Sequence, residues 1–203
     1  MPDSAHLHDT VSDVGISNKP QHLCPWWIGY LLASPVRRIF NNPRKILAGH
    51  VRPGMTVLEP GPGMGFFTIE LARLVGSTGR VIAVDIQPEM LGALRRRATG
   101  AGVLERVEIR QAMPDSLGLG ELAPTVDFTL AFAVVHELPS AATFFREVAD
   151  VSKPGARILV VEPKGHVTAA KFNDELRAAR DAGFALLDSG EERRNTALLE
   201  KRS

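Results

Sequence analysis

Short β-branched runs alternate with stretches of helical pattern from about residue 55 to residue 182. The runs have the length and composition of strands, and the stretches between them are long enough for helices. Strands are predicted at 56–59, 80–85, 106–110, 126–134 and 157–161, and helices at 66–75, 88–101, 141–151 and 168–182. This alternation is typical of a parallel sheet that is covered by helices on both faces.

The alternation ends at Gly183. Residues 184–188 and 196–200 form two more strand-like runs, with no room for a helix between them. They predict a hairpin at the sheet edge, which adds an antiparallel strand. The predicted fold is therefore α/β: a doubly wound, mostly parallel seven-stranded sheet with a C-terminal antiparallel hairpin and an N-terminal helical lid.

The part of the chain before the alternation divides into two segments. Residues 1–21 are polar and rich in turn-forming residues, which predicts a flexible N-terminal arm. Residues 22–50 carry many apolar and aromatic side chains, and prolines at positions 25, 35 and 43 divide them into two or three short helices. We interpret residues 22–50 as the lid and residues 51–203 as a single domain.

Composition narrows the class of protein. The chain has 24 Lys and Arg against 23 Asp and Glu, a formal net charge of +1, so no nucleic-acid partner is expected. One cysteine excludes an internal disulfide framework and an all-cysteine zinc site, and no metal site is predicted. There is no apolar run of membrane-spanning length, and residues 1–10 lack the apolar stretch of a secretory signal. A cytoplasmic protein is expected, and the oligomeric state is left open.

A glycine-rich loop follows the first predicted strand. Residues 57–67 read Val-Leu-Glu-Pro-Gly-Pro-Gly-Met-Gly-Phe-Phe. Ligands of doubly wound sheets bind at the carboxyl ends of the strands, where glycines let the backbone approach closely. Gly61, Gly63 and Gly65 have the spacing Gly-x-Gly-x-Gly, not the Gly-x-Gly-x-x-Gly of dinucleotide sites. Glu59 would repel a pyrophosphate, but it suits a ligand that carries positive charge.

A second acid ends the next predicted strand. Asp85 lies 20 positions after Gly65, where two carboxylate oxygens can bind both hydroxyls of a ribose. Ile86 follows and provides an apolar wall for a flat base.

Together, these residues resemble the S-adenosylmethionine site of class I methyltransferases. The similarity extends from about residue 51 to the C-terminus and includes the order of elements and the closing hairpin. Residues 126–139, Val-Asp-Phe-Thr-Leu-Ala-Phe-Ala-Val-Val-His-Glu-Leu-Pro, resemble the fourth-strand motif of small-molecule methyltransferases of the ubiquinone/menaquinone-biosynthesis type. Residues 153–157, Lys-Pro-Gly-Ala-Arg, resemble the Lys-Pro-Gly-Gly turn before the fifth strand of those enzymes.

The resemblance implies S-adenosylmethionine as cofactor, S-adenosylhomocysteine as product and a small-molecule acceptor. It places the glycine loop against the amino-acid portion and ribose, Asp85 on the ribose hydroxyls and Ile86 on the adenine. The implied cofactor-binding residues are Glu59, Gly61, Gly63, Gly65, Asp85, Ile86, Ala112, Met113, Phe132 and Ala133.

One segment departs from the family pattern. Such enzymes often carry Gly-Asp-Ala after the third strand, with the Asp on the adenine amino group, whereas residues 110–115 here read Arg-Gln-Ala-Met-Pro-Asp. Asp115 could take that role from a shifted position, or Gln111 or backbone groups near Met113 could take it. Asp115 could instead be the N-cap of a helix that begins before Leu117.

Three residues after the fourth and fifth predicted strands are catalytic candidates. His136, Glu137 and Glu162 follow strands at the edge where the ligand is expected. An imidazole titrates near neutral pH and suits proton abstraction, although methyl transfer needs a base only if the acceptor must lose a proton. Each of the three could instead serve only packing or local hydrogen bonding. His166 is a further candidate for the acceptor pocket.

The predicted lid holds other candidates for that pocket, namely His22, Cys24, Trp26, Trp27 and Tyr30. Aromatic side chains there would exclude water and attract a sulfonium through cation–π interaction. The alternative is that they pack the lid onto the domain. The arginines at 95–97, the only short basic run, are interpreted as a solvated helix face.

Two other functions fit parts of this pattern. One is an NAD(P)-dependent oxidoreductase, which the glycine spacing, Glu59 and the lack of a Tyr-x-x-x-Lys pair disfavour. The other is a methyltransferase-like protein that binds S-adenosylmethionine or a related nucleoside without turnover. An enzyme that methylates RNA or protein is a further alternative, and the near-neutral charge disfavours the RNA version.

Overall fold

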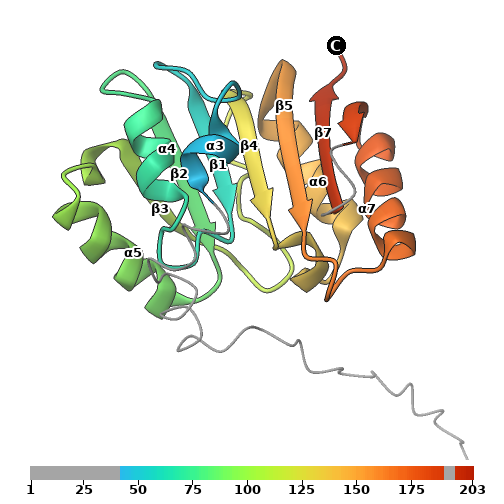
Figure 1. The fold of residues 1–203 in the computed structure, drawn as a ribbon, viewed down its shortest axis with the longest axis horizontal. Coiled ribbons are helices and arrows are strands. Elements are labelled where there is room, and N and C mark those ends of the chain that lie inside the picture. The colour runs from blue at the N-terminus through green and yellow to red at the C-terminus, as the bar shows by residue number, and fades with distance from the viewer. Residues whose placement is uncertain (1–41, 190–194) are drawn as a thin grey trace, which may run out of the picture.

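The computed structural model describes residues 42–189 and 195–203, which form one seven-stranded sheet with helices on both faces (Figure 1). The strands are β1 Thr56–Pro60, β2 Arg80–Asp85, β3 Val107–Gln111, β4 Val126–Phe132, β5 Ser152–Glu162, β6 Phe184–Ser189 and β7 Asn195–Lys201. The helices are α3 Pro43–Leu47, α4 Thr68–Leu74, α5 Pro88–Gly100, α6 Ala141–Val151 and α7 Ala169–Asp181, with short 3₁₀ turns η1 Leu104–Arg106 and η2 Val135–Glu137.

The strand order is β3-β2-β1-β4-β5-β7-β6. The first five strands pair in parallel, and β7 is antiparallel to both β5 and β6. The predicted hairpin is therefore confirmed, with its second strand next to β5 and its first strand at the edge. Because the order reverses between β1 and β4, the carboxyl ends of these two strands flank the switch point where doubly wound sheets bind ligands.

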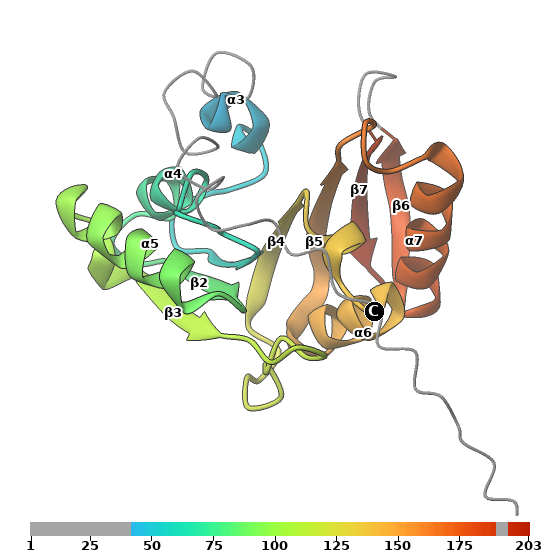
Figure 2. The same cartoon turned by 90° about the horizontal axis from the view of Figure 1, so that it is seen from below.

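Alternation along the strands creates one apolar core on each face of the sheet. Helices α3, α4 and α5 cover one face, and α6 and α7 cover the other (Figure 2). Val57 of β1 packs toward α4, and the next residue, Leu58, packs toward α6. Both are fully buried, as a strand covered on two faces requires.

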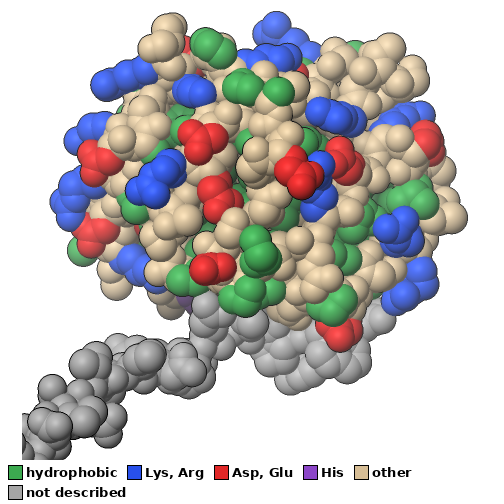
Figure 3. Space-filling view, turned by 180° about the vertical axis from the view of Figure 1, so that it is seen from behind, with side chains coloured by type: hydrophobic (Ala, Val, Ile, Leu, Met, Phe, Trp, Pro, Cys, Tyr) green, Lys and Arg blue, Asp and Glu red, His purple; other side chains and the backbone are tan. Residues whose placement is uncertain are grey.

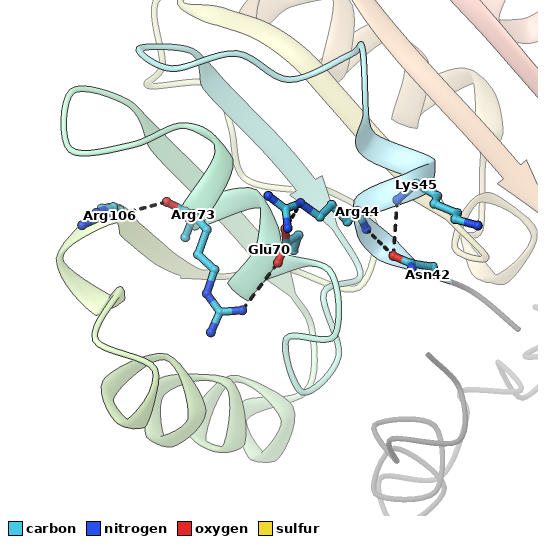
Figure 4. Close-up of polar contacts among 7 residues, drawn as sticks. Asn42, Arg44, Lys45, Glu70, Arg73 and Arg106 are labelled. Carbon is cyan, nitrogen blue, oxygen red and sulfur yellow. Dashed lines mark hydrogen bonds and ion pairs between the residues drawn. The ribbon is translucent and has the colours of Figure 1, made fainter. Parts of the chain in front are cut away.

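The short helix α3 lies at the end of the segment predicted as a lid. Asn42 caps it, because its side-chain oxygen accepts hydrogen bonds from the amides of Arg44 and Lys45 at 3.1 and 3.3 Å. Glu70 of α4 lies between Arg44 and Arg73, at 3.8 and 3.5 Å (Figure 4). These exposed ion pairs add little stability, so buried Leu47 is the main anchor of α3 on the domain. Residues 22–41 of the predicted lid lie outside the described residues.

Two details differ from the predicted elements. Strand β5 begins at Ser152, so the Lys-Pro-Gly-Ala segment lies within the strand as an irregularity. The register of β4 against β5 shifts there, between Val126 and Phe128, and Gly155 has a φ of 75°. In addition, no helix follows Asp115, which is exposed, so the N-cap prediction is wrong. Gly118, Gly120 and Pro124 explain this, because these residue types disfavour a helix.

No helix in the described part of the chain is both long and apolar enough to cross a membrane.

Phe145 tests the core between α6 and the sheet. Its side chain is fully buried, with ring centroids 5.0 Å from Phe144 and 6.4 Å from Phe184. We expect Phe145→Ala to lower the free energy of unfolding by about 3–5 kcal/mol, because it leaves a cavity. Urea denaturation measures the change. Leu187→Ala is the control, because Leu187 is exposed and should change stability by less than about 0.5 kcal/mol.

Candidate active site

The site lies at the edge of the sheet where β1, β2, β4 and β5 end, the lower edge in Figure 1. The predicted cofactor-binding residues follow β1, β2, β3 and β4, and the predicted acceptor-side residues follow β4 and β5. The structure therefore brings both sets to one edge. His22, Cys24, Trp26, Trp27 and Tyr30 lie outside the described residues.

Backbone hydrogen bonds hold the glycine loop after β1. The amide of Gly61 donates to Val84 O of β2 at 2.9 Å, and the amide of Gly65 donates to Pro62 O at 2.9 Å. Arg97 of α5 donates to Met64 O at 2.7 Å. Arg97 is therefore half-buried and fixes the loop, which corrects its interpretation as part of a solvated face; Arg95 and Arg96 are exposed as predicted.

The three loop glycines have positive φ but different surroundings. A Cβ on Gly61 would lie 2.8 Å from a methyl group of Val134, and one on Gly65 would lie 2.4 Å from Leu94 Cδ1. At Gly63, where φ is +52°, a Cβ would meet no described atom within 4 Å. Gly61 and Gly65 therefore permit close packing within the protein, whereas Gly63 borders open space in which a ligand can lie.

Asp85 links the end of β2 to this loop. Its Oδ2 accepts a hydrogen bond from the amide of Gly63 at 3.2 Å, and its Oδ1 accepts one from the amide of Gln87 at 3.0 Å. Burial raises the pKa of Asp85, and these backbone donors partly oppose the shift. Each carboxylate oxygen has a second lone pair, so Asp85 can still accept two ligand hydroxyls.

Glu59 is buried beneath the loop, at the carboxyl end of β1. Its side chain is 3% exposed, and its Oε2 has no hydrogen-bond partner among the described residues. Burial raises the pKa of Glu59 to about 8; the nearby Thr68 hydroxyl opposes this shift, and the charge of Asp85 adds to it. A ligand cation at the loop would favour the ionised form of Glu59.

The segment after β3 passes the same edge. The amide of Ala112 donates to Asp85 O at 3.0 Å, which joins this segment to the end of β2. A tight turn follows, in which Met113 and Ser116 pair and the Met113 side chain is 58% exposed. An exposed methionine beside Asp85 offers an apolar surface of the kind that covers a flat ring.

The chain after β4 turns sharply. Ala133 has a φ of 55°, the only positive φ of a non-glycine residue in the described part of the chain. Its amide donates to Val161 O of β5 at 2.7 Å, and the ring of Phe132 packs 4.6 Å from Phe67. Such a conformation costs about 1–3 kcal/mol and is typical of functional sites. Here it directs the chain from the cofactor side of the edge into η2, which carries His136.

The turn η2 places His136 on a buried carboxylate. Glu162 is fully buried at the end of β5; its Oε1 accepts a hydrogen bond from the amide of Val135 at 2.8 Å, and its Oε2 bonds to His136 Nδ1. A carboxylate only accepts, so Nδ1 carries the hydrogen and a neutral His136 has its lone pair on Nε2. The hydrogen bond that His136 donates to Glu162 raises the pKa of His136, against the opposing effect of burial.

Two further predicted residues lie beside His136. Glu137 Oε1 is 3.9 Å from His136 Nε2, too far for a hydrogen bond, and the ring of His166 lies edge-on with its centroid 6.0 Å away. Burial raises the pKa of Glu137; His136 opposes this shift, and the charges of Glu162 and Asp85 add to it.

Two residues of α7 belong to this site and were not predicted. Lys171 donates from Nζ to His136 O at 3.2 Å, and Glu175, one turn further on, is 3% exposed. The sequence holds a signal for the second, because its spacing places Glu175 on one helix face with the apolar residues Phe172 and Ala179. No comparable pattern marks Lys171. In the described part of the chain, no three His, Cys, Asp or Glu side chains are arranged to hold a metal ion.

Comparison with known proteins agrees with this geometry. The family described as "Methyltransferase domain" matches residues 52–195. Ubiquinone/menaquinone biosynthesis C-methyltransferases of Klebsiella pneumoniae and Escherichia coli are 36% identical over 113 residues, which is 55% of this chain and 44% of each relative. The chain thus matches less than half the length of these relatives.

Solved structures show the same fold. A structure described as a SAM-dependent methyltransferase from Aquifex aeolicus has a TM-score of 0.77 and 26% identity, and the match covers 88% of this chain and 98% of that one. A methyltransferase-like structure from Methanococcus maripaludis, at 15% identity, has a TM-score of 0.70 over 88% and 90% of the two chains. The latter shows the fold alone.

The fold and the arrangement of the candidate site are those of the class I, Rossmann-like methyltransferases. The chain belongs to the methyltransferase-domain family, whose match covers most of its length.

The buried Glu59 makes stability depend on pH. Its pKa is near 4.5 when unfolded and about 8 when folded, so the folded state binds more protons between these values and loses stability as pH rises from about 5 to 8. We expect the stability of the Glu59→Gln variant to depend less on pH. At pH 8 its free energy of unfolding should exceed that of wild type by about a few kcal/mol, as expected for a pKa shift of this size. Urea denaturation at pH 5, 6, 7 and 8 measures both effects. If stability depended on pH as steeply in the variant as in wild type, Glu59 would not be the cause of the pH dependence. The control is Glu89→Gln, which changes an exposed glutamate and should leave the pH dependence of stability as in wild type.

Proposed function

We propose that the chain transfers a methyl group from S-adenosylmethionine to a small-molecule acceptor whose proton is removed by His136. The observation that supports this most directly is the contact between His136 Nδ1 and the fully buried Glu162. This contact leaves Nε2 as the proton-accepting atom on the side of Glu137. A histidine oriented by a buried carboxylate is a recurring arrangement of general bases.

The residues present fit the cofactor. Asp85 would accept the two ribose hydroxyls, and the open space beside Gly63 would hold the ribose and the amino-acid portion. Glu59 would balance the ammonium, and Ile86 and Met113 would contact the adenine. The remaining predicted contacts, Gly61, Gly65, Ala112, Phe132 and Ala133, shape the loop and the turn around it. When bound, the cofactor supplies an electrophilic methyl group on a sulfonium.

The protein's own contribution is alignment and one proton transfer. His136 Nε2 would take the proton of an acceptor O–H, which leaves the acceptor as an anionic nucleophile. The bound cofactor would supply the methyl group, with its C–S bond broken and S-adenosylhomocysteine as the leaving group. Glu162 holds the ring in position and stabilises the imidazolium that forms. Alignment alone can supply roughly 7–11 kcal/mol.

We infer that the acceptor is a hydroxylated aromatic compound, such as a phenol or quinol. The base at His136 suits a phenolic proton, and the curated relatives are named for C-methylation in quinone biosynthesis. Loss of a phenolic proton activates both the oxygen and the ring carbons. The face in Figure 3 intersperses Lys and Arg with Asp and Glu, without the single-sign surface that a nucleic-acid acceptor would favour. Transfer of a labelled methyl group to phenols and quinols, with thiols and amines in parallel, tests the acceptor class; transfer only to thiols or amines would contradict it.

Gly63→Val tests the cofactor site. The added side chain enters the space beside the loop and should abolish binding of S-adenosylhomocysteine, measured by calorimetric titration with NADH in parallel. The matched control is Gly102→Val, since Gly102 also has positive φ (+65°) and no described atom within 4 Å of an added Cβ. It imposes the same backbone strain away from the loop and should bind like wild type. Unchanged binding in Gly63→Val, or binding of NADH instead, would refute the site.

The pH dependence of turnover tests the base. His136 must be neutral to accept a proton, so kcat/KM should rise with pH through the pKa of His136, which lies above 6.5. We expect Glu162→Gln to shift this rise to lower pH, because the main cause of the raised pKa is lost, and to lower the plateau. His136→Ala should lower kcat by about 10²–10⁴.

His50→Gln is the control for these variants, because His50 stacks on Phe128 and is not part of the candidate site. Its pH profile should match wild type. A fully active His136→Ala variant would remove His136 from the mechanism.

A further inference from the structure

A second buried acid lies behind the His136–Glu162 pair. Glu175 is on the buried face of α7, with Phe172 and Ala179, and its side chain is 3% exposed. Neither of its carboxyl oxygens has a hydrogen-bond partner among the described residues. A buried polar group without partners is costly, and an apolar residue at this position of the helix would pack at lower cost.

Glu175 and Glu162 belong to the same layer of the molecule. Ile158 and Val160 of β5 pack in the core under α6 and α7, and Glu162 is next in the same alternation. Phe172 and Ala179, which flank Glu175, pack in that core as well. By their positions on β5 and α7, the two acids therefore both belong to the layer between the sheet and α7.

The charged groups around Glu175 come from three elements. Glu162 lies on β5, His136 on η2, and Lys171 and Asp174 on α7 itself. Lys171 is one helical turn before Glu175, and its Nζ donates to His136 O at 3.2 Å. Burial raises the pKa of Glu175 to about 7, to which the charge of Glu162 adds; Lys171 and His136 oppose the shift. Glu175 is therefore a buried acid whose carboxylate form is destabilised by burial, on the helix whose Lys171 donates to His136 O.

We propose that Glu175 is a positioning residue that exchanges a proton in step with His136. It holds its proton while His136 is neutral, and it releases that proton when His136 becomes an imidazolium. The released carboxylate then stabilises the imidazolium together with Glu162. This role rests on the function proposed above, and it assigns Glu175 no contact with the acceptor or the cofactor.

The proton count balances over one turnover. The acceptor O–H gives its proton to His136 Nε2, and Glu175 loses a proton to solvent, so the buried cluster keeps its net charge. After methyl transfer, His136 loses its proton and Glu175 takes one from solvent. One proton is released for each methyl group transferred, and no further reactant is needed.

The test is the pKa of the His136 imidazole, measured by NMR titration of the whole chain and assigned by comparison with His136→Gln. We expect Glu175→Gln to lower this pKa by roughly half a pH unit or more, because the variant cannot become anionic. The kcat should fall about threefold, the rate equivalent of half a pH unit, with KM unchanged. The control is Asp174→Asn, which removes an exposed acid of the same helix and should leave the pKa of His136 unchanged.

A purely structural Glu175 would give a different result. Glu175→Gln would then change the free energy of unfolding and leave the pKa of His136 and the acid limb of kcat/KM as in wild type, which would overturn the proposal. Glu175→Asp, which keeps the charge, should restore most of the pKa of His136. Because the titration needs no acceptor, it separates this proposal from the proposed reaction. A shifted pKa in Glu175→Gln together with a fully active His136→Ala would support the coupling of Glu175 to His136 and reject His136 as the base.

Discussion

The contacts of the buried Glu162 carboxylate are the interaction on which the candidate site around His136 depends. This carboxylate lies at the end of β5, fully out of solvent, and it binds two groups that follow β4: the amide of Val135 and the imidazole of His136. A buried carboxylate without such donors would be strongly destabilising. The same two contacts that satisfy Glu162 also fix the orientation of η2 and the tautomer of His136. The contacts that stabilise the sheet edge are therefore the same contacts that orient His136, the proposed base.

The cofactor side uses a different principle, in which backbone amides rather than side chains define the shape. Asp85 accepts from the amides of Gly63 and Gln87, so the end of β2 and the loop after β1 hold each other in place. Arg97 fixes the loop from α5 through Met64 O. The ligand-facing atoms at Gly63 are backbone, which explains why a residue without a side chain occupies the most open position of the loop.

The fold could be predicted well from the sequence, and so could the strand ends at which the candidate residues lie, because both follow from local patterns. Strand β2 and helix α6 match their predicted bounds, and the strand-end positions of Asp85 and Glu162 follow from topology. Contacts between distant segments could not be predicted in this way. No periodicity shows that Arg97 reaches Met64 O, or that Lys171 reaches His136 O, since each depends on how a helix packs against a distant loop or turn at the edge. The N-cap prediction at Asp115 shows the opposite error. There, a local capping signal predicted a helix, but the glycines that follow disfavour one.

The acids at this edge are less stable as carboxylates than they would be in water, and this affects how the site would bind the cationic donor of the proposed reaction. Burial raises the pKa values of Glu59, Asp85 and Glu137, so each carboxylate is less stable in the empty site than in water. Under the proposed function, the sulfonium and the ammonium of the donor would relieve that cost by favouring the ionised acids. Transfer would convert the sulfonium into a neutral thioether and remove part of this stabilisation. The same acids would therefore favour the charged donor over the neutral product.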